Sequence, residues 1–280
     1  MKSLSAFAER HPYWFVAIME AVVVFVYLLV GTTAYFLKLS NMALYGLANL
    51  GLTLIVIVLL TASRWWRTIG FKSLNRWRDL LYFLVPLVPM VLNLIPGAQI
   101  DSIVYVSEVL VIALMVGFAE ETIFRGLMLQ ALKPLGHWRA AIITALLFGL
   151  THAMNALTGK SALESAMQIG YAVAIGFAYA ALALKKDVLW LLILAHFLTD
   201  FVYFIQKPGF SLSSFWQSFI VISLTVVFTA YGIYVMRQKP QACNPTAQDV
   251  KKQKWLLANR IGNDSDEIKA RADGSSLRNV

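Results

Sequence analysis

The segment Gly117 to Arg125 reads GFAEETIFR and lies inside a long apolar run, residues 103–132. It places the ionisable groups of Glu120, Glu121 and Arg125 in a stretch that otherwise has the composition of a membrane-spanning helix. A charge in the hydrocarbon core of a bilayer costs at least a few kcal/mol. A protein that only had to fold would carry leucine at such positions. We therefore look for the function in this segment and in whatever faces it.

The composition of the whole chain is that of an integral membrane protein. Its 280 residues are 59% hydrophobic and 14% charged, whereas a soluble globular domain is about 45–50% apolar and about 25% charged. Runs such as 14–36 and 42–62 are long enough to cross a hydrocarbon core about 30 Å thick. The net charge of +9 is distributed between these runs, which argues against nucleic acid as a partner. The single cysteine, Cys243, excludes an intramolecular disulfide.

Eight membrane spans are expected from the apolar runs. They cover approximately residues 13–37, 42–62, 80–99, 103–132, 139–156, 162–184, 188–206 and 212–236. Pro86, Pro89 and Pro96 predict an irregular third span, because proline removes a backbone donor. We expect an all-α polytopic membrane helix bundle of about eight transmembrane helices over residues 1–236. Residues 237–280 are expected to form a polar, flexible cytoplasmic tail.

The distribution of lysine and arginine predicts the orientation. With a cytoplasmic N-terminus, the inner segments carry Lys2, Arg10, the basic residues of 64–78, Lys133, Arg139, Lys185, Lys186, Arg237 and Lys239. The outer loops then carry only Lys38, Lys160 and Lys207. This asymmetry follows the positive-inside rule for eight spans with both termini in the cytoplasm. The densest basic group is interleaved with tryptophans, which is typical of a loop lying on anionic lipid headgroups. It consists of Arg64, Arg67, Lys72, Arg76 and Arg78, with Trp65, Trp66 and Trp77 between them.

Three clusters of residues with functional side chains lie on three different spans. They consist of Glu120, Glu121 and Arg125; of Phe148 and His152; and of His196 and Asp200. At 1.5 Å per residue from the cytoplasmic end of each helix, Glu120, His152 and His196 lie about 18, 20 and 14 Å deep. Ionisable groups from three helices at a similar depth predict one polar cavity near the middle of the membrane.

The two adjacent glutamates are expected to differ in role. Glu121 and Arg125 are one helical turn apart and can form an ion pair, which we interpret as structural. Glu120 lies about 100° around the helix and has no local partner. A single intramembrane histidine is also compatible with a structural bridge between helices. Three clusters at matching depth are harder to explain by packing alone.

The chemistry available to these residues is hydrolysis by an activated water molecule. A carboxylate and an imidazole that face each other can remove a proton from water, and a second imidazole can donate a hydrogen bond to the oxyanion of a tetrahedral intermediate. Glu120, His152 and His196 could alternatively hold zinc with water at the open position, as in a metalloprotease. The H-E-x-x-H spacing is absent. The sequence leaves the metal dependence open, because both schemes use the same residues.

The order Glu-Glu-x-x-x-Arg at 120–125, Phe-x-x-x-His at 148–152 and His-x-x-x-Asp at 196–200 resembles the three motifs of the CPBP intramembrane proteases. This family includes the type II CAAX prenyl endopeptidases and the bacteriocin-processing or Abi proteins, and the resemblance covers roughly residues 101–205. It implies an eight-helix intramembrane endopeptidase. By this resemblance Glu120 and His152 activate the water, and His196 with residue 200 forms the oxyanion hole.

The resemblance further implies that Glu121, Arg125 and Phe148 support the site. The prenyl-protease branch commonly has asparagine at the last motif position, whereas this chain has Asp200. Asparagine donates a hydrogen bond at any pH, while aspartate must be protonated or must instead orient His196. The expected substrate is therefore a membrane-associated peptide or protein, without a specific expectation of prenylation. The expected location is the bacterial cytoplasmic membrane.

Two other classes of function use the same types of residue. Buried Glu, His and Asp are also typical of a transporter or proton relay. Inverted repeats and paired broken helices would favour transport, and neither is evident in the sequence. A catalytically silent protein that binds a partner in the cavity is the third hypothesis.

Overall fold

The computed structural model describes residues 2–74, 76–100, 102–154, 161–207 and 213–238. Within these ranges it consists of helices, short connections and one isolated β-bridge between Ala98 and Gln206. The expected all-α polytopic membrane bundle is confirmed. Nearly all of the predicted tail, with Cys243, lies outside the described residues, so the expected domain division stays a prediction.

The helices follow the expected spans, with boundaries shifted by a few residues. The N-terminal helices are α1 (Lys2–Arg10), α2 (Pro12–Leu37) and α3 (Asn41–Ser63), and the irregular third span contains η1 (Trp77–Phe83), η2 (Val85–Leu87) and α4 (Val88–Asn93). The central helices are α5 (Ile103–Glu121), η3 (Thr122–Met128), α6 (Leu129–Leu132), η4 (Lys133–Leu135) and α7 (His137–His152), followed by α8 (Ala162–Lys186), α9 (Trp190–Phe204) and α10 (Ser214–Arg237).

Five helical segments in the described part of the chain are long and apolar enough to cross a membrane. They are Pro12–Leu37, Asn41–Ser63, Ile103–Leu135, Ala162–Lys186 and Ser214–Arg237. The apolar helix α9 has 15 residues and α7 has 16, so both are shorter than the roughly 20 residues of a typical span. Large apolar side chains such as Phe25, Val58 and Phe219 are more than half exposed. A multi-pass membrane protein presents such side chains to lipid.

The third expected span is irregular, as its prolines predict. Pro86 lies in η2 and Pro89 in the short α4, which ends at Asn93. The chain beyond α4 is held to the end of α9: the backbone N–H of Gln99 donates to the carbonyl of Ile205, and that of Lys207 donates to the carbonyl of Gly97.

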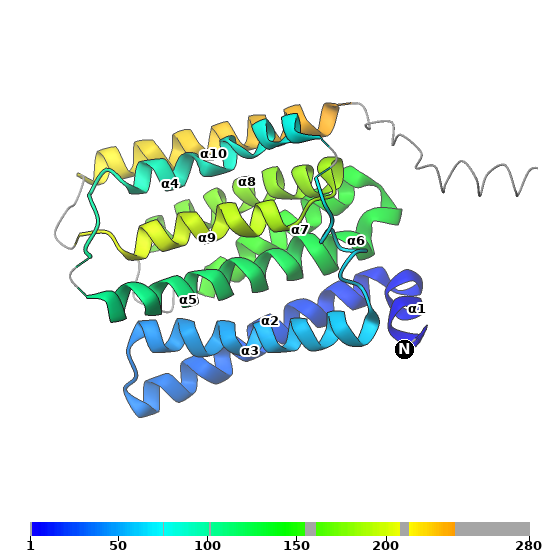
Figure 1. Cartoon of the computed structure of the whole chain (residues 1–280), viewed down its shortest axis with the longest axis horizontal. Coiled ribbons are helices and arrows are strands. Elements are labelled where there is room, and N and C mark those ends of the chain that lie inside the picture. Colours follow the sequence, from blue (N-terminus) through cyan, green and yellow to red (C-terminus); the bar gives the residue numbers. More distant parts are fainter. Residues whose placement is uncertain (1, 75, 101, 155–160, 208–212, 239–280) are drawn as a thin grey trace, which may run out of the picture. The chain divides into compact units, whose positions relative to one another are not determined.

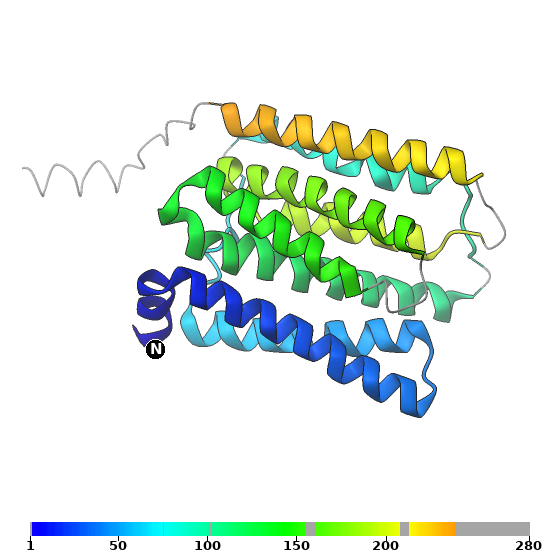
Figure 2. The ribbon, with the colours of Figure 1, turned by 180° about the vertical axis from the view of Figure 1, so that it is seen from behind.

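The helices are arranged around a central group formed by α5, α7, α8 and α9. Figures 1 and 2 show α2 and α3 along one edge, and α10 with the segment ending in α4 along the opposite edge. The packed pairs are α2 with α3, α3 with α5, α5 with α9, α9 with α4, α7 with α8, and α8 with α10. The three predicted clusters lie in this central group, on α5 with η3, on α7 and on α9.

A buried ion pair attaches the irregular third span to the rest of the bundle. The ammonium of Lys186, at the end of α8, lies 2.8 Å from the Asp79 carboxylate, and both side chains are almost fully buried. The same ammonium lies 3.6 Å from the centre of the Tyr82 ring, and the Tyr82 hydroxyl donates to the side chain of Gln238 after α10. These contacts hold η1 against the ends of α8 and α10.

Replacing Lys186 with methionine is expected to lower the free energy of unfolding by about 3–5 kcal/mol, because it leaves the Asp79 carboxylate buried without its counter-ion. Thermal unfolding in detergent micelles measures this. The adjacent Lys185 donates to the main-chain carbonyl of Gln238 and forms no ion pair with a described residue, so Lys185→Met is the matched control and should shift the transition much less. Equal shifts for the two variants would contradict the assignment of the stabilising contact to Lys186.

Candidate active site

The two glutamates stand at the end of α5, immediately before a change in helix geometry. Glu121 is the last residue of α5, and the seven residues of η3 that follow form a π-helical segment. Such wide turns inside α-helices are rare and occur frequently at functional sites. Gly117, one turn before Glu121, allows α5 to approach α9 closely, because a Cβ there would lie 3.0 Å from the Ile193 carbonyl oxygen and the Phe197 nitrogen.

The expected ion pair between Glu121 and Arg125 is present and buried. Arg125 Nη1 lies 3.1 Å from Glu121 Oε1, and each side chain is 1% exposed. The guanidinium carbon lies 4.1 Å from the centre of the Phe148 ring, a cation–π geometry. Gly176 of α8 makes room for this arrangement, since a Cβ there would lie 3.2 Å from both Arg125 Nη2 and the Phe148 ring. The pair therefore joins α5, η3, α7 and α8.

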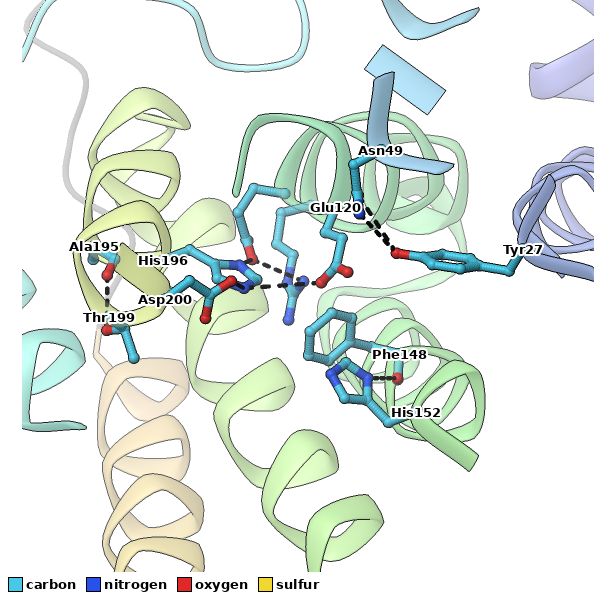
Figure 3. Close-up of polar contacts among 11 residues, drawn as sticks. Tyr27, Asn49, Glu120, Phe148, His152, Ala195, His196, Thr199 and Asp200 are labelled. Carbon is cyan, nitrogen blue, oxygen red and sulfur yellow. Dashed lines mark hydrogen bonds and ion pairs between the residues drawn. The ribbon is translucent and has the colours of Figure 1, made fainter. Parts of the chain in front are cut away.

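His196 of α9 connects all three carboxylates of the site. Its Nδ1 lies 2.7 Å from Glu121 Oε1, while its Nε2 lies 3.4 Å from Asp200 Oδ2 and 3.8 Å from Glu120 Oε2. Because Glu121 is paired with Arg125, its oxygen is an acceptor and Nδ1 is the donor. The other ring nitrogen is thus the one that faces Asp200 and Glu120 (Figure 3).

His152, the last residue of α7, is oriented by its own helix. Its Nδ1 lies 2.9 Å from the main-chain oxygen of Phe148, and the two rings are 4.6 Å apart in an edge-on arrangement. A carbonyl oxygen only accepts, so Nδ1 carries the proton and Nε2 is left as an acceptor. Phe148 therefore contacts the guanidinium of Arg125 and also positions the imidazole of His152.

Glu120 and Glu121 occupy different surroundings, as the sequence predicts. The Glu120 side chain is 15% exposed, against 1% for Glu121. Figure 3 shows Glu120 between His196 on one side and Tyr27 on the other. Tyr27 of α2 accepts a hydrogen bond from Asn49 of α3 at 3.2 Å. Glu120 is therefore the more accessible carboxylate, and it lies beside polar groups from α2 and α3.

A cavity of about 380 Å³ adjoins these residues. Its wall includes Glu121, Arg125, His152, His196 and Asp200 together with apolar side chains of α4, α8 and α10. Glu120 is absent from this wall, although its oxygen lies near the same His196 nitrogen as Asp200 does. The structure thus brings the second and third clusters to one cavity with Glu121 and Arg125, and it places Glu120 at the edge of the site.

The predicted alternative metal ligands do not fit a zinc ion in this arrangement. No three His, Cys, Asp or Glu side chains among the described residues are grouped so that they could hold a metal. We therefore derive no chemical step through a metal ion.

The structure also shows a fourth intramembrane carboxylate that the sequence analysis missed. Glu20 of α2 accepts a hydrogen bond from the Thr151 hydroxyl at 2.7 Å, and its second oxygen is buried with no hydrogen-bond partner among the described residues. Thr151 directly precedes His152 in α7. The signal was available, since Glu20 is a charged residue inside the apolar run 13–37 and the rule applied to Glu120 applies equally to it.

Comparison with known proteins places a family match on the part of the chain that carries the site. The Rce1-like family, described as type II CAAX prenyl endopeptidase Rce1-like, matches residues 102–202. This range starts just before α5 and ends within α9, so it includes all three clusters. Comparison with curated proteins and with solved structures gives no match. Residues 102–202 are therefore similar to the Rce1-like type II CAAX prenyl endopeptidases, and the family resemblance expected from the motifs is confirmed.

Proposed function

We propose that this protein is an intramembrane endopeptidase that hydrolyses a peptide bond of a membrane-associated peptide or protein with a water molecule activated by Glu120 and His152. The observation that carries the proposal is the convergence of carboxylates on His196. Its ring contacts Glu120 and Glu121 of the first motif and Asp200 of the third motif. The match to a protease family over residues 102–202 supports the reaction class.

The proposed first step is the activation of water. His152 Nε2 is an acceptor, because Nδ1 donates to the Phe148 carbonyl. A water molecule that donates one hydrogen to Nε2 and the other to the Glu120 carboxylate is held for attack. Glu120 takes the proton as the oxygen of water bonds to the scissile carbonyl carbon. It then returns this proton to the amide nitrogen as the C–N bond breaks, so that the enzyme ends unchanged.

His196 is proposed to stabilise the oxyanion that forms in this step. Its Nδ1 is held by Glu121, which fixes the ring and leaves Nε2 directed toward Asp200 and Glu120. A proton on Nε2 can be donated to the negatively charged oxygen of the tetrahedral intermediate. The buried Glu121–Arg125 pair acts by holding His196 in place.

Asp200 is proposed to orient His196 and not to donate to the oxyanion itself. Its carboxylate oxygen lies 3.4 Å from Nε2, one helical turn along α9. An ionised carboxylate only accepts hydrogen bonds, so in this form Asp200 accepts from the protonated Nε2 of His196 and orients the ring. Asparagine, common at this position in the prenyl-protease branch, would donate directly.

The substrate is proposed to be a segment with apolar side chains. The cavity is lined by Leu92, Ile175 and Leu224 among other apolar residues. A volume of about 380 Å³ lies at the lower end of the range for small-molecule sites, about 300–1,000 Å³. It can hold a few side chains of an extended peptide.

Comparing the peptide termini of cells that carry the wild-type protein or His152→Ala tests this function. We expect new termini in at least one membrane-associated protein with the wild-type protein, and their loss with His152→Ala. His137→Ala is the matched control, because His137 is an exposed histidine at the opposite end of the same helix, and it should retain the termini. Identical termini with the wild-type protein and His152→Ala would refute the proposal.

A further inference from the structure

The cavity lies where three helices end. Its wall includes Asn93, His152 and Tyr203. Asn93 and His152 are the last residues of α4 and α7, and Tyr203 is the last residue but one of α9. All three helices run in the same direction, from the end of the bundle that holds the N-terminus toward the opposite end (Figure 1). The cavity therefore extends from the site toward the end of the bundle where α4, α7 and α9 terminate.

The helices α8 and α10 run in the opposite direction, and the positions of their wall residues place the cavity toward the same end. The wall residues of α10 are Ile220, Val221 and Leu224, within the first half of a helix that spans Ser214–Arg237. The wall residues of α8 begin at Gln168, six positions after its first residue. Both helices start at the end where α9 stops (Figures 1 and 2).

The opposite side of the site is closed by packed side chains. The guanidinium of Arg125 lies against the rings of Phe148, Phe124 and Tyr179. Beyond this layer, Leu129 and Leu182 are fully buried and belong to the main hydrophobic core. A peptide cannot pass through such packing without unfolding it.

Most of the basic residues lie at the end of the bundle beyond these packed side chains, which is the end that holds the N-terminus; we call it the closed end. Those at this end, in the described part of the chain, are Lys2, Arg10, Arg64, Arg67, Lys72, Arg76, Arg78, Lys133, Arg139, Lys185, Lys186 and Arg237, all at or near helix ends on that side. Arg125 is an exception, because it lies inside the bundle in the buried pair with Glu121. The opposite end, toward which the cavity extends, is the open end, and it carries Lys38 and Lys207 in its described connections. Basic residues concentrate in cytoplasmic segments, so the closed end is assigned to the cytoplasm.

We propose that the site takes its substrate from the non-cytoplasmic side of the membrane. The substrate class is then a peptide exposed on that side, or an exposed loop or membrane-proximal segment of a membrane protein. Its apolar side chains occupy the cavity. That the protein cleaves a peptide bond of this substrate rests on the proposed function. The direction of access rests separately on the cavity wall, the packed core and the charge distribution.

Single cysteines and a membrane-impermeant thiol reagent test the direction of access. The starting variant is Cys243→Ser, which removes the native thiol. Leu224→Cys then reports the cavity wall, Lys38→Cys reports the open end, and Arg139→Cys reports the closed end. Each variant is treated in intact cells and in inverted membrane vesicles.

We expect Leu224→Cys and Lys38→Cys to react in intact cells, and Arg139→Cys to react only in inverted vesicles. Reaction of Leu224→Cys only from the side of Arg139→Cys would overturn the proposal, as would exchanged sidedness of Lys38→Cys and Arg139→Cys. No reaction of Leu224→Cys from either side would also overturn it.

The labelling result does not depend on proteolysis, so it separates this inference from the proposed function. The termini found with the wild-type protein provide the second readout, and they should lie in non-cytoplasmic or membrane-embedded segments. Termini that lie only in cytoplasmic segments would refute the direction of access while supporting proteolysis. The expected labelling without any change in termini would refute proteolysis while supporting the direction of access.

Discussion

Replacing Glu120 with glutamine is expected to lower the rate of substrate cleavage by about 10²- to 10⁴-fold. Glutamine keeps the size of the side chain but cannot take a proton from water, so the step assigned to Glu120 is lost. The side chain is 15% exposed and makes no buried ion pair like that of Glu121. The variant should therefore remain folded and inserted, and its unfolding temperature should stay near that of the wild-type protein.

The measurement is the rate at which the wild-type-dependent termini appear in reconstituted membranes. Glu108→Gln is the matched control, since Glu108 is an exposed glutamate on the same helix, three turns earlier. It is expected to cleave at the wild-type rate. If Glu120→Gln cleaved as fast as Glu108→Gln, the role of general base would have to be assigned to another residue.

Replacing Arg125 with leucine is expected to lower the free energy of unfolding by about 3–5 kcal/mol. The change leaves the Glu121 carboxylate at 1% exposure without its counter-ion, and one of its oxygens already has no hydrogen-bond partner in the part of the chain that the structure describes. It also removes the guanidinium from the Phe148 ring. Since Glu121 and Phe148 hold His196 and His152, cleavage should be lost together with stability.

Unfolding in detergent micelles, followed by circular dichroism, measures the stability. Arg139→Leu is the control, because Arg139 is exposed at the start of α7, and it should have little effect. The double variant Glu121→Leu with Arg125→Leu should recover much of the lost stability, because no charge is left unpaired. It should stay inactive, because His196 loses its partner. An unfolding transition of Arg125→Leu at the wild-type position would contradict the structural role of the pair.

The roles of neighbouring residues on one helix could be derived from helical geometry. The separation of four residues predicts the Glu121–Arg125 ion pair, and the structure contains it at 3.1 Å. The same periodicity separates Glu120 from this pair, and the two glutamates do differ in exposure. The irregular third span was also predictable, because Pro86 and Pro89 cannot continue a regular helix.

The partners of His196 could not be derived in the same way. The sequence suggested Asp200 and Glu120, which lie 3.4 and 3.8 Å from Nε2, but the shortest contact is with Glu121 at 2.7 Å. This contact depends on how α5 and α9 are rotated about their axes and on the close approach at Gly117. Glu20 itself was recognisable in the sequence as a charge inside an apolar run, but its partner Thr151, 131 residues away in the chain, was not.

The sequence by itself determined that the chain is a helical membrane protein, which residues carry charge into the membrane, and which of them share a helix face. These properties follow from composition and from a repeat of 3.6 residues, and both are local. Only the tertiary structure decided that Glu121 holds His196, that Glu120 stands at the edge of the cavity and not in its wall, and that the cavity extends away from the basic end. Those properties depend on the rotation and the length of helices packed against each other, because side chains from different helices meet only after packing sets both.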